Sequence, residues 1–247
     1  MSDLPTDWRE QMVQMIRGTR PLDGTWFRGG PVLSPTDQIE VYANQYRLRL
    51  PEAVIYELRG LDALLGDALP PLVAQYLNYY PSQTWTLDRV ADQFEHFLAS
   101  INAPVVQIDM ARLDIAVSRA FTASEPQTFD TTTLRAETKL VLQPPVQLLE
   151  LSTSVFRTRS ASLSGVDIPE LEFRDFRVVV FRPERKIRHL VLAHAAYQLL
   201  QVFKSPTSLA DGLQTFSNDA ETTNALAANL GDWMRTFAAS RILGPPG

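Results

Sequence analysis

The spacing of apolar residues changes along the chain, and this change limits the fold more than any other feature of the sequence. In the first half, apolar residues such as Ile39 and Tyr42 recur at the period of an amphipathic helix. In the second half, a β-branched run at 176–182 is typical of a strand, and a turn can lead from it into a second strand at 185–190. The sequence therefore predicts a mainly α protein with a small β component.

These two patterns predict two domains. Residues 1–103 are expected to form a helical bundle, and residues 104–247 a linker helix followed by a winged-helix-like α+β module. The linker helix is predicted at 108–123 from its apolar stripe. In the module, the predicted hairpin precedes three helices, expected near 192–203, 207–216 and 221–239.

Local signals interrupt the helical pattern at several points. Pro51 has no N–H and clashes with the carbonyl four residues before it, so we expect a kink or break there, followed by a short helix that carries Val54. Thr86 is predicted to cap a helix that contains Phe94. The segment 152–165 is rich in Ser, Thr and Arg and is predicted to be a long loop.

Composition excludes several kinds of site and disfavours some partners. The chain has no cysteine, and therefore no disulfide, thiolate metal site or cysteine nucleophile. Its formal net charge is −5, whereas a general nucleic-acid binder is usually basic. The acidic first residues lack the apolar stretch of a signal peptide, and no apolar run reaches the roughly 20 residues that span a bilayer. We expect a cytoplasmic protein with no membrane partner.

No residue pattern indicates catalysis or metal binding. His189 and His194 are five residues apart, which does not place them on one helix face. Neither a glycine-rich phosphate loop after a strand nor a nucleophile elbow is present. Asp109 and Asp114 are interpreted as charges on a helix surface. We expect no metal, no cofactor and no catalytic residue, and an enzyme of unknown type is the weakest alternative.

Two groups of side chains indicate binding. The cations between 174 and 188 have two explanations. They can belong to a solvated hairpin that is protected against edge pairing, or to a wing that attracts nucleic acid or an acidic peptide. Tyr42, Tyr46 and Arg47 are candidates for a protein interface, where Tyr, Trp and Arg concentrate binding energy. The cations are Arg174, Arg177, Arg182, Arg185, Lys186 and Arg188.

Short groups of mainly apolar and aromatic residues, spread over residues 36–243, form a distinctive pattern. It includes Ile39-Glu40-Val41-Tyr42, Leu64-Leu65-Gly66, Phe97-Leu98, Ala111-Arg112-Leu113-Asp114, Leu140-Val141-Leu142-Gln143-Pro144 and Val178-Val179-Val180-Phe181-Arg182. In these positions the chain resembles the HvfC/BufC-type family of bacterial proteins, whose members carry a DNA-binding label and whose core matches about residues 36–100. The chain departs from the family at Leu58-Arg59-Gly60-Leu61, where Phe-Pro is usual.

The resemblance implies a non-catalytic accessory subunit in the biosynthesis of peptide natural products. Such a subunit forms a heterodimer with a multinuclear non-haem iron oxidative enzyme and presents a ribosomally made precursor peptide to it. The DNA-binding label supplies the alternative, a transcriptional regulator. A fold or label alone does not decide between them, because function depends on the site.

The resemblance also implies that the second domain recognises the precursor peptide. If the strand at 176–182 lies at a sheet edge, a peptide strand can add to its unpaired backbone groups. Apolar side chains of the following helix can then form pockets. The residues predicted to bind the peptide are Phe176, Val178, Val180 and Arg182 in the strand and Leu199 and Phe203 in the helix.

Overall fold

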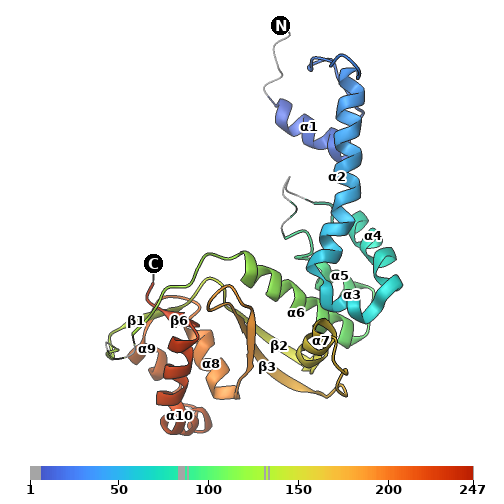
Figure 1. The fold of residues 1–247 in the computed structure, drawn as a ribbon. Helices are drawn as coiled ribbons and strands as arrows, with labels where there is room; N and C mark the ends of the chain where they lie inside the picture. Colours follow the sequence, from blue (N-terminus) through green and yellow to red (C-terminus); the bar gives the residue numbers. More distant parts are fainter. Residues whose placement is uncertain (1–6, 83–86, 88, 131, 133, 247) are drawn as a thin grey trace. The chain divides into compact units, whose positions relative to one another are not determined.

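The structure is a computed structural model that describes residues 7–82, 87, 89–130, 132 and 134–246 (Figure 1). The chain divides into two compact units, Met1–Gln93 and Phe94–Gly247. The boundary predicted after residue 103 falls ten residues later than this division. The difference arises because α5 (Phe94–Ser100) packs against α6 (Val105–Thr122) and so belongs to the second unit.

The described part of the first unit is helical, as predicted. Its longest helix, α2, begins at a capping box in which Ser34 and Asp37 each accept a hydrogen bond from the other's backbone N–H. α2 packs against α1 and α4 and buries Ile39 and Ala43. The helices are α1 (Trp8–Arg17), α2 (Pro35–Glu57), α3 (Arg59–Leu65), the 3₁₀ turn η1 (Gly66–Ala68) and α4 (Leu69–Tyr79).

Two predictions about helix ends in this region need correction. α2 does not break at Pro51 but continues to Glu57. Ala43 before the proline and Val54 after it are both fully buried, so packing on both sides holds the helix together despite the lost hydrogen bond. Thr86 lies outside the described residues. The helix that it was predicted to cap begins only at Phe94.

The second unit combines helices with two small antiparallel sheets. One sheet has the strand order β2-β3-β4, and the other has the order β5-β1-β6. After α5 and α6, its elements are β1 (Lys139–Leu142), β2 (Gln147–Thr153), α7 (Val155–Ser164), β3 (Phe173–Phe181), β4 (Arg188–Val191), α8 (His194–Val202), β5 (Thr207–Ser208), α9 (Leu209–Gln214), α10 (Ala220–Ala239) and β6 (Leu243–Gly244).

The β2-β3-β4 sheet is covered on both faces around β3. α6 packs against β2 and β3, and α8 packs against β3 (Figure 1). Val178 and Val180 are fully buried, and so are Val179 and Phe181, which share a core with α8 and α10. β3 is therefore the central strand of its sheet and lies between two layers of helix.

The mainly α fold with a small β component is confirmed, and so are the hairpin and the three helices after it. β4 begins three residues later than predicted, because the turn from β3 includes Arg185 in the left-handed region (φ 61°). The predicted loop at 152–165 is wrong. This segment contains α7, which buries Phe156 and Ala161. The helix is capped at its C-terminal end by Gly165 in the left-handed conformation.

Candidate functional site

β2 forms one edge of its sheet, and its outer main-chain groups can be identified from the pairing. Leu192 donates its N–H to the carbonyl of Arg177 at 2.8 Å, so the main-chain groups of Arg177 face β4. Glu150 is the partner of Arg177 on β2, so its main-chain N–H and C=O must point away from β3, toward the outer edge of the sheet. Because strand residues alternate, Leu148 faces outward as well.

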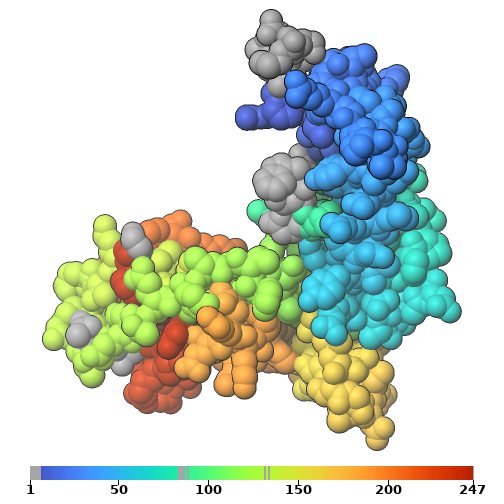
Figure 2. All heavy atoms as spheres, turned by 45° about the horizontal axis from the view of Figure 1, so that its top comes forward, coloured from blue at the N-terminus to red at the C-terminus, as the bar shows by residue number. Residues whose placement is uncertain are grey.

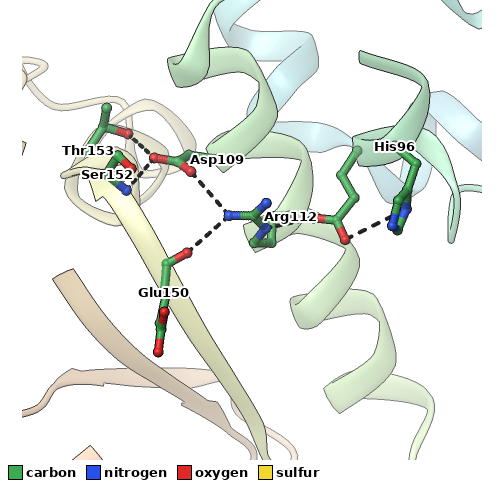
Figure 3. Close-up of polar contacts among 7 residues, drawn as sticks. His96, Asp109, Arg112, Glu150, Ser152 and Thr153 are labelled. Atoms are coloured by element: carbon green, nitrogen blue, oxygen red, sulfur yellow. Dashed lines mark hydrogen bonds and ion pairs between the residues drawn. The ribbon is translucent and has the colours of Figure 1, made fainter. Parts of the chain in front are cut away.

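This outer edge is open at one end and occupied at the other. Among the described residues, the N–H and C=O of Leu148 and the N–H of Glu150 have no hydrogen-bond partner. The C=O of Glu150 accepts a bond from Nη1 of Arg112 at 3.0 Å. The N–H of Ser152 donates to Oδ2 of Asp109 at 2.8 Å (Figure 3). We call the unpaired groups of Leu148 and Glu150 the open edge.

A groove of about 500 Å³ lies along the open edge. Its wall on one side is α6, its wall on the other side is α8, and residues 147–150 of β2 lie between them. This volume is in the range of ordinary ligand sites. The wall residues are Arg112, Ile115, Ala116 and Arg119 from α6 and Tyr197 and Gln201 from α8. We call this feature the β2 groove.

Charged groups hold the occupied end of the edge in place. Asp109 is buried and also accepts a bond from Oγ1 of Thr153 at 2.8 Å. Nε of Arg112 lies 2.7 Å from Oε2 of Glu95. Nη1 of Arg112 lies 3.6 Å from Oδ1 of Asp109 (Figure 3). Asp109 and Arg112 thus form an ordered polar network that reaches from α6 to the end of β2.

The α8 wall is less polar than its side chains suggest. Burial raises the pKa of the Tyr197 hydroxyl, and the neighbouring Glu150 carboxylate raises it further, while a hydrogen bond with Gln201 has the opposite effect. Tyr197 is therefore a neutral side chain at physiological pH. Tyr197 is buried and hydrogen-bonded to Gln201, so it forms a packed part of the α8 wall.

The strand residues that were predicted to bind a peptide do not line this groove. Phe176, Val178 and Val180 are buried, and β3 pairs with β2 along one side and with β4 along the other. A peptide therefore cannot add to β3 where both neighbours are present. The run of apolar residues at 178–181 was a signal of this, since a strand buried on both faces does not alternate.

The other three predicted residues have structural roles. Arg182 donates to the carbonyl of Ala120 at 3.0 Å and to Oε1 of Glu125 at 2.8 Å, so it caps the C-terminal end of α6. Leu199 and Phe203 are fully buried in the core and cannot form pockets for a bound chain.

The residues that were predicted to bind a partner lie on α2 and differ in exposure. The side chain of Tyr42 is 59% exposed, Arg47 is exposed, and Tyr46 is half-buried. Nε of Arg47 donates to the carbonyl of Ala43 at 3.3 Å, so its guanidinium is partly engaged within α2.

Beside Tyr42, α2 exposes three large hydrophobic side chains that the sequence analysis did not single out as an interface. At about 100° per residue they fall within about 120° of the helix circumference. Part of the surface of α2, in blue, is uncovered in Figure 2. We call these residues the α2 face: Val41, Tyr42, Leu48 and Tyr56.

The aspartates interpreted as surface charges are instead buried. Asp109 is 1% exposed and Asp114 is 0% exposed, and Asp114 pairs with Nε of Arg159 at 2.6 Å. Sequence spacing could not show this, because their partners lie on β2 and α7. Arg112 and Arg119 share a helix face with Ile115, a mixture that indicates a polar wall rather than a core.

Within the residues that the structure describes, no three His, Asp or Glu side chains gather closely enough to hold a metal ion. None of the described helices has both the length and the apolar character needed to cross a lipid bilayer. No model of a known protein family matches the chain, and no curated protein sequence matches it.

Proposed function

We propose that this protein is an accessory subunit that binds an extended peptide in the β2 groove and carries it to a partner enzyme. The observation that supports peptide binding is the open edge of β2, which lies between two helix walls. An unpaired strand edge is the main-chain template for strand addition, and flanking walls give side-chain specificity.

The chemistry of the groove suits a main-chain ligand. The open edge offers two N–H groups and one C=O, which match the alternating groups of an added strand. On the α6 wall, Arg112 and Arg119 lie beside Ile115 and Ala116, which are both buried. Glu95 and Glu150 line the groove together with Arg112 and Arg119, so the charges of the lining balance and the main-chain groups dominate recognition.

The α2 face is the proposed docking surface for the enzyme. The side chains of Leu48 and Tyr56 are 71% and 74% exposed, and the guanidinium of Arg59 lies 6.0 Å from the Tyr56 ring centre. Exposed aromatic and arginine side chains are the residues that concentrate binding energy at interfaces. The resemblance to the HvfC/BufC-type family supports a multinuclear non-haem iron oxidative enzyme as the partner.

A transcriptional regulator is the second proposal, and it is favoured by the exposed cations Arg185, Lys186 and Arg188 around the β3–β4 turn. Part of the cation stretch is engaged elsewhere. Arg182 caps α6, and Nε of Arg174 lies 3.2 Å from Oε2 of Glu172. The remaining cations equally suit a protected strand edge.

Peptide selection on the full chain tests the proposal. Random dodecapeptides displayed on phage would be selected on the immobilised protein, and a selected peptide would be titrated beside duplex DNA. We expect the dissociation constant of the peptide to change less than about tenfold between about 50 and 200 mM salt, because main-chain bonds release no counterions. DNA held by six to ten phosphate contacts loses about 10³–10⁵ in affinity over that range.

Hydrogen exchange would locate the bound peptide. Protection of the Leu148 and Glu150 amides on peptide addition is expected. Failure to select any peptide, together with sequence-selective DNA binding, would replace the accessory subunit with the regulator.

A further inference from the structure

We infer that Asp109 and Arg112 end the added strand at Glu150, so that the β2 groove accepts a peptide that makes only three main-chain hydrogen bonds with β2. The inference rests on the proposed peptide binding and specifies which peptides can bind. It makes Arg112 a residue that determines specificity, because its position decides where pairing stops.

The two side chains occupy the places that a longer peptide would need. Arg112 donates to the Glu150 carbonyl, where the N–H of a further peptide residue would donate. Asp109 accepts from the Ser152 N–H, where a peptide carbonyl would accept. Together the two side chains satisfy the Glu150 carbonyl and the Ser152 N–H, which the next residues of an added strand would otherwise satisfy.

Displacing these side chains would cost more than it gains. A peptide N–H that replaced Arg112 would form one neutral hydrogen bond with Glu150. The bond lost would be the charge-assisted one from Arg112, whose guanidinium is also positioned by ion pairs with Glu95 and Asp109. If Asp109 moved, a buried carboxylate would lose its bonds to Ser152 and Thr153. The occupied end therefore remains closed when a peptide binds.

The limit holds for both strand directions. An antiparallel peptide residue opposite Leu148 exchanges two bonds with it, and a carbonyl two residues away accepts the Glu150 N–H. A parallel peptide residue opposite Leu149 bonds to Leu148 and Glu150, and an earlier carbonyl accepts the Leu148 N–H. In each case one peptide N–H is used, and the N–H two residues away meets Arg112. That position tolerates proline or an N-methyl group.

Hydrogen exchange of the free protein is the first test, and it needs no ligand. The amides of Leu148, Glu150 and Ser152 all belong to the outer edge of β2. We expect Ser152 to exchange at least about tenfold more slowly than the other two, because only its N–H is bonded. Equal exchange at the three amides would show that the occupied end is not closed and would overturn the inference.

N-methyl scanning of a selected dodecapeptide is the second test. In the wild-type protein, one methylated position within the paired segment should lower affinity about tenfold or more. The position two residues away should change affinity less than about twofold, because its N–H is unused. In Arg112→Ala, that second position should become sensitive, since the Glu150 carbonyl is then free.

Glu95→Gln is the matched control, because it removes an ion-pair partner of Arg112 but leaves the Arg112 bond to Glu150. It should keep the wild-type pattern of one sensitive position. Two sensitive positions in the wild-type protein, or an unchanged pattern in a folded Arg112→Ala variant, would overturn the inference. Failure of every peptide to bind, or binding that no methyl group affects, would instead contradict strand addition itself.

Discussion

The two edges of the β2-β3-β4 sheet are protected in different ways. The outer edge of β4 is short, with four residues, and it lies beside the exposed cations Arg185, Lys186 and Arg188. Short strands and charges are common devices against unwanted edge pairing. The outer edge of β2 has a groove along it, and only its far end is closed, by Asp109 and Arg112.

This difference indicates which edge is available to a ligand. Both strands pair with β3, so unpaired backbone alone does not distinguish them. β2 differs because α6 and α8 provide walls on both sides of its open edge. A free strand edge therefore becomes a candidate site when side chains from other elements surround it and leave room.

The largest expected effect concerns the wall of the groove. Arg182→Ala should lower the free energy of unfolding by about 3 kcal/mol, because carbonyls at the end of α6 and the Glu125 carboxylate lose their partner. Arg188→Ala, on the β4 edge, should change it by less than about 0.5 kcal/mol, since that side chain is exposed. Urea unfolding measures both. Similar losses in the two variants would mean that Arg182 does not anchor α6.

Proline substitution tests the edges directly. Leu148→Pro removes an outward N–H from the open edge and should lower the affinity for a selected dodecapeptide about tenfold or more. Val191→Pro removes an outward N–H from β4 and should leave the affinity within about twofold. Isothermal titration would measure both, with thermal unfolding to confirm the fold. A larger loss in Val191→Pro would move the peptide site to β4.

The dependence of stability on pH has contributions from both units. The contribution of Glu57 in the first unit must be separated from that of the β2-β3-β4 sheet. Burial raises the pKa of Glu57 to about 7. Hydrogen bonds from the backbone of Arg89, Ala91 and Val90 lower this pKa but do not offset the effect of burial. The folded state thus binds more protons than the unfolded state between about pH 4.5 and 7, so this group's stabilisation is present at low pH and is lost as pH rises through that window. Glu57→Gln should flatten this slope in thermal melts. An unchanged slope would show that Glu57 is ionised in the folded protein at acidic pH.

The smallest effect separates β4 from the groove. Burial lowers the pKa of His189 on β4, and the charge of Arg159 lowers it further. The folded state therefore binds fewer protons than the unfolded state just below about pH 6.5, and stability falls as pH decreases through that range. His189→Gln should remove this loss, while peptide affinity at neutral pH should stay unchanged. A decrease in affinity would place His189 near the ligand.

The sequence by itself determined the local structure of this protein. The capping box of Ser34 and Asp37, the apolar period of the helices and the hairpin at β3 and β4 each depend on residues close together in the chain. Such signals were sufficient for the mainly α fold and for the helices that follow the hairpin. Even there, α7 was missed, because Phe156 and Ala161 favour a helix only when other elements bury them.

Only the tertiary structure decided where the candidate site lies. Apolar β-branched residues are equally suited to a central and an edge strand, so the sequence reasoning chose β3, whereas the pairing leaves β2 open. The burial of Asp109 likewise depends on Ser152 and Thr153, more than 40 residues away in the chain. Strand order and buried charge are set by contacts between distant segments, and no local spacing records which segments will meet.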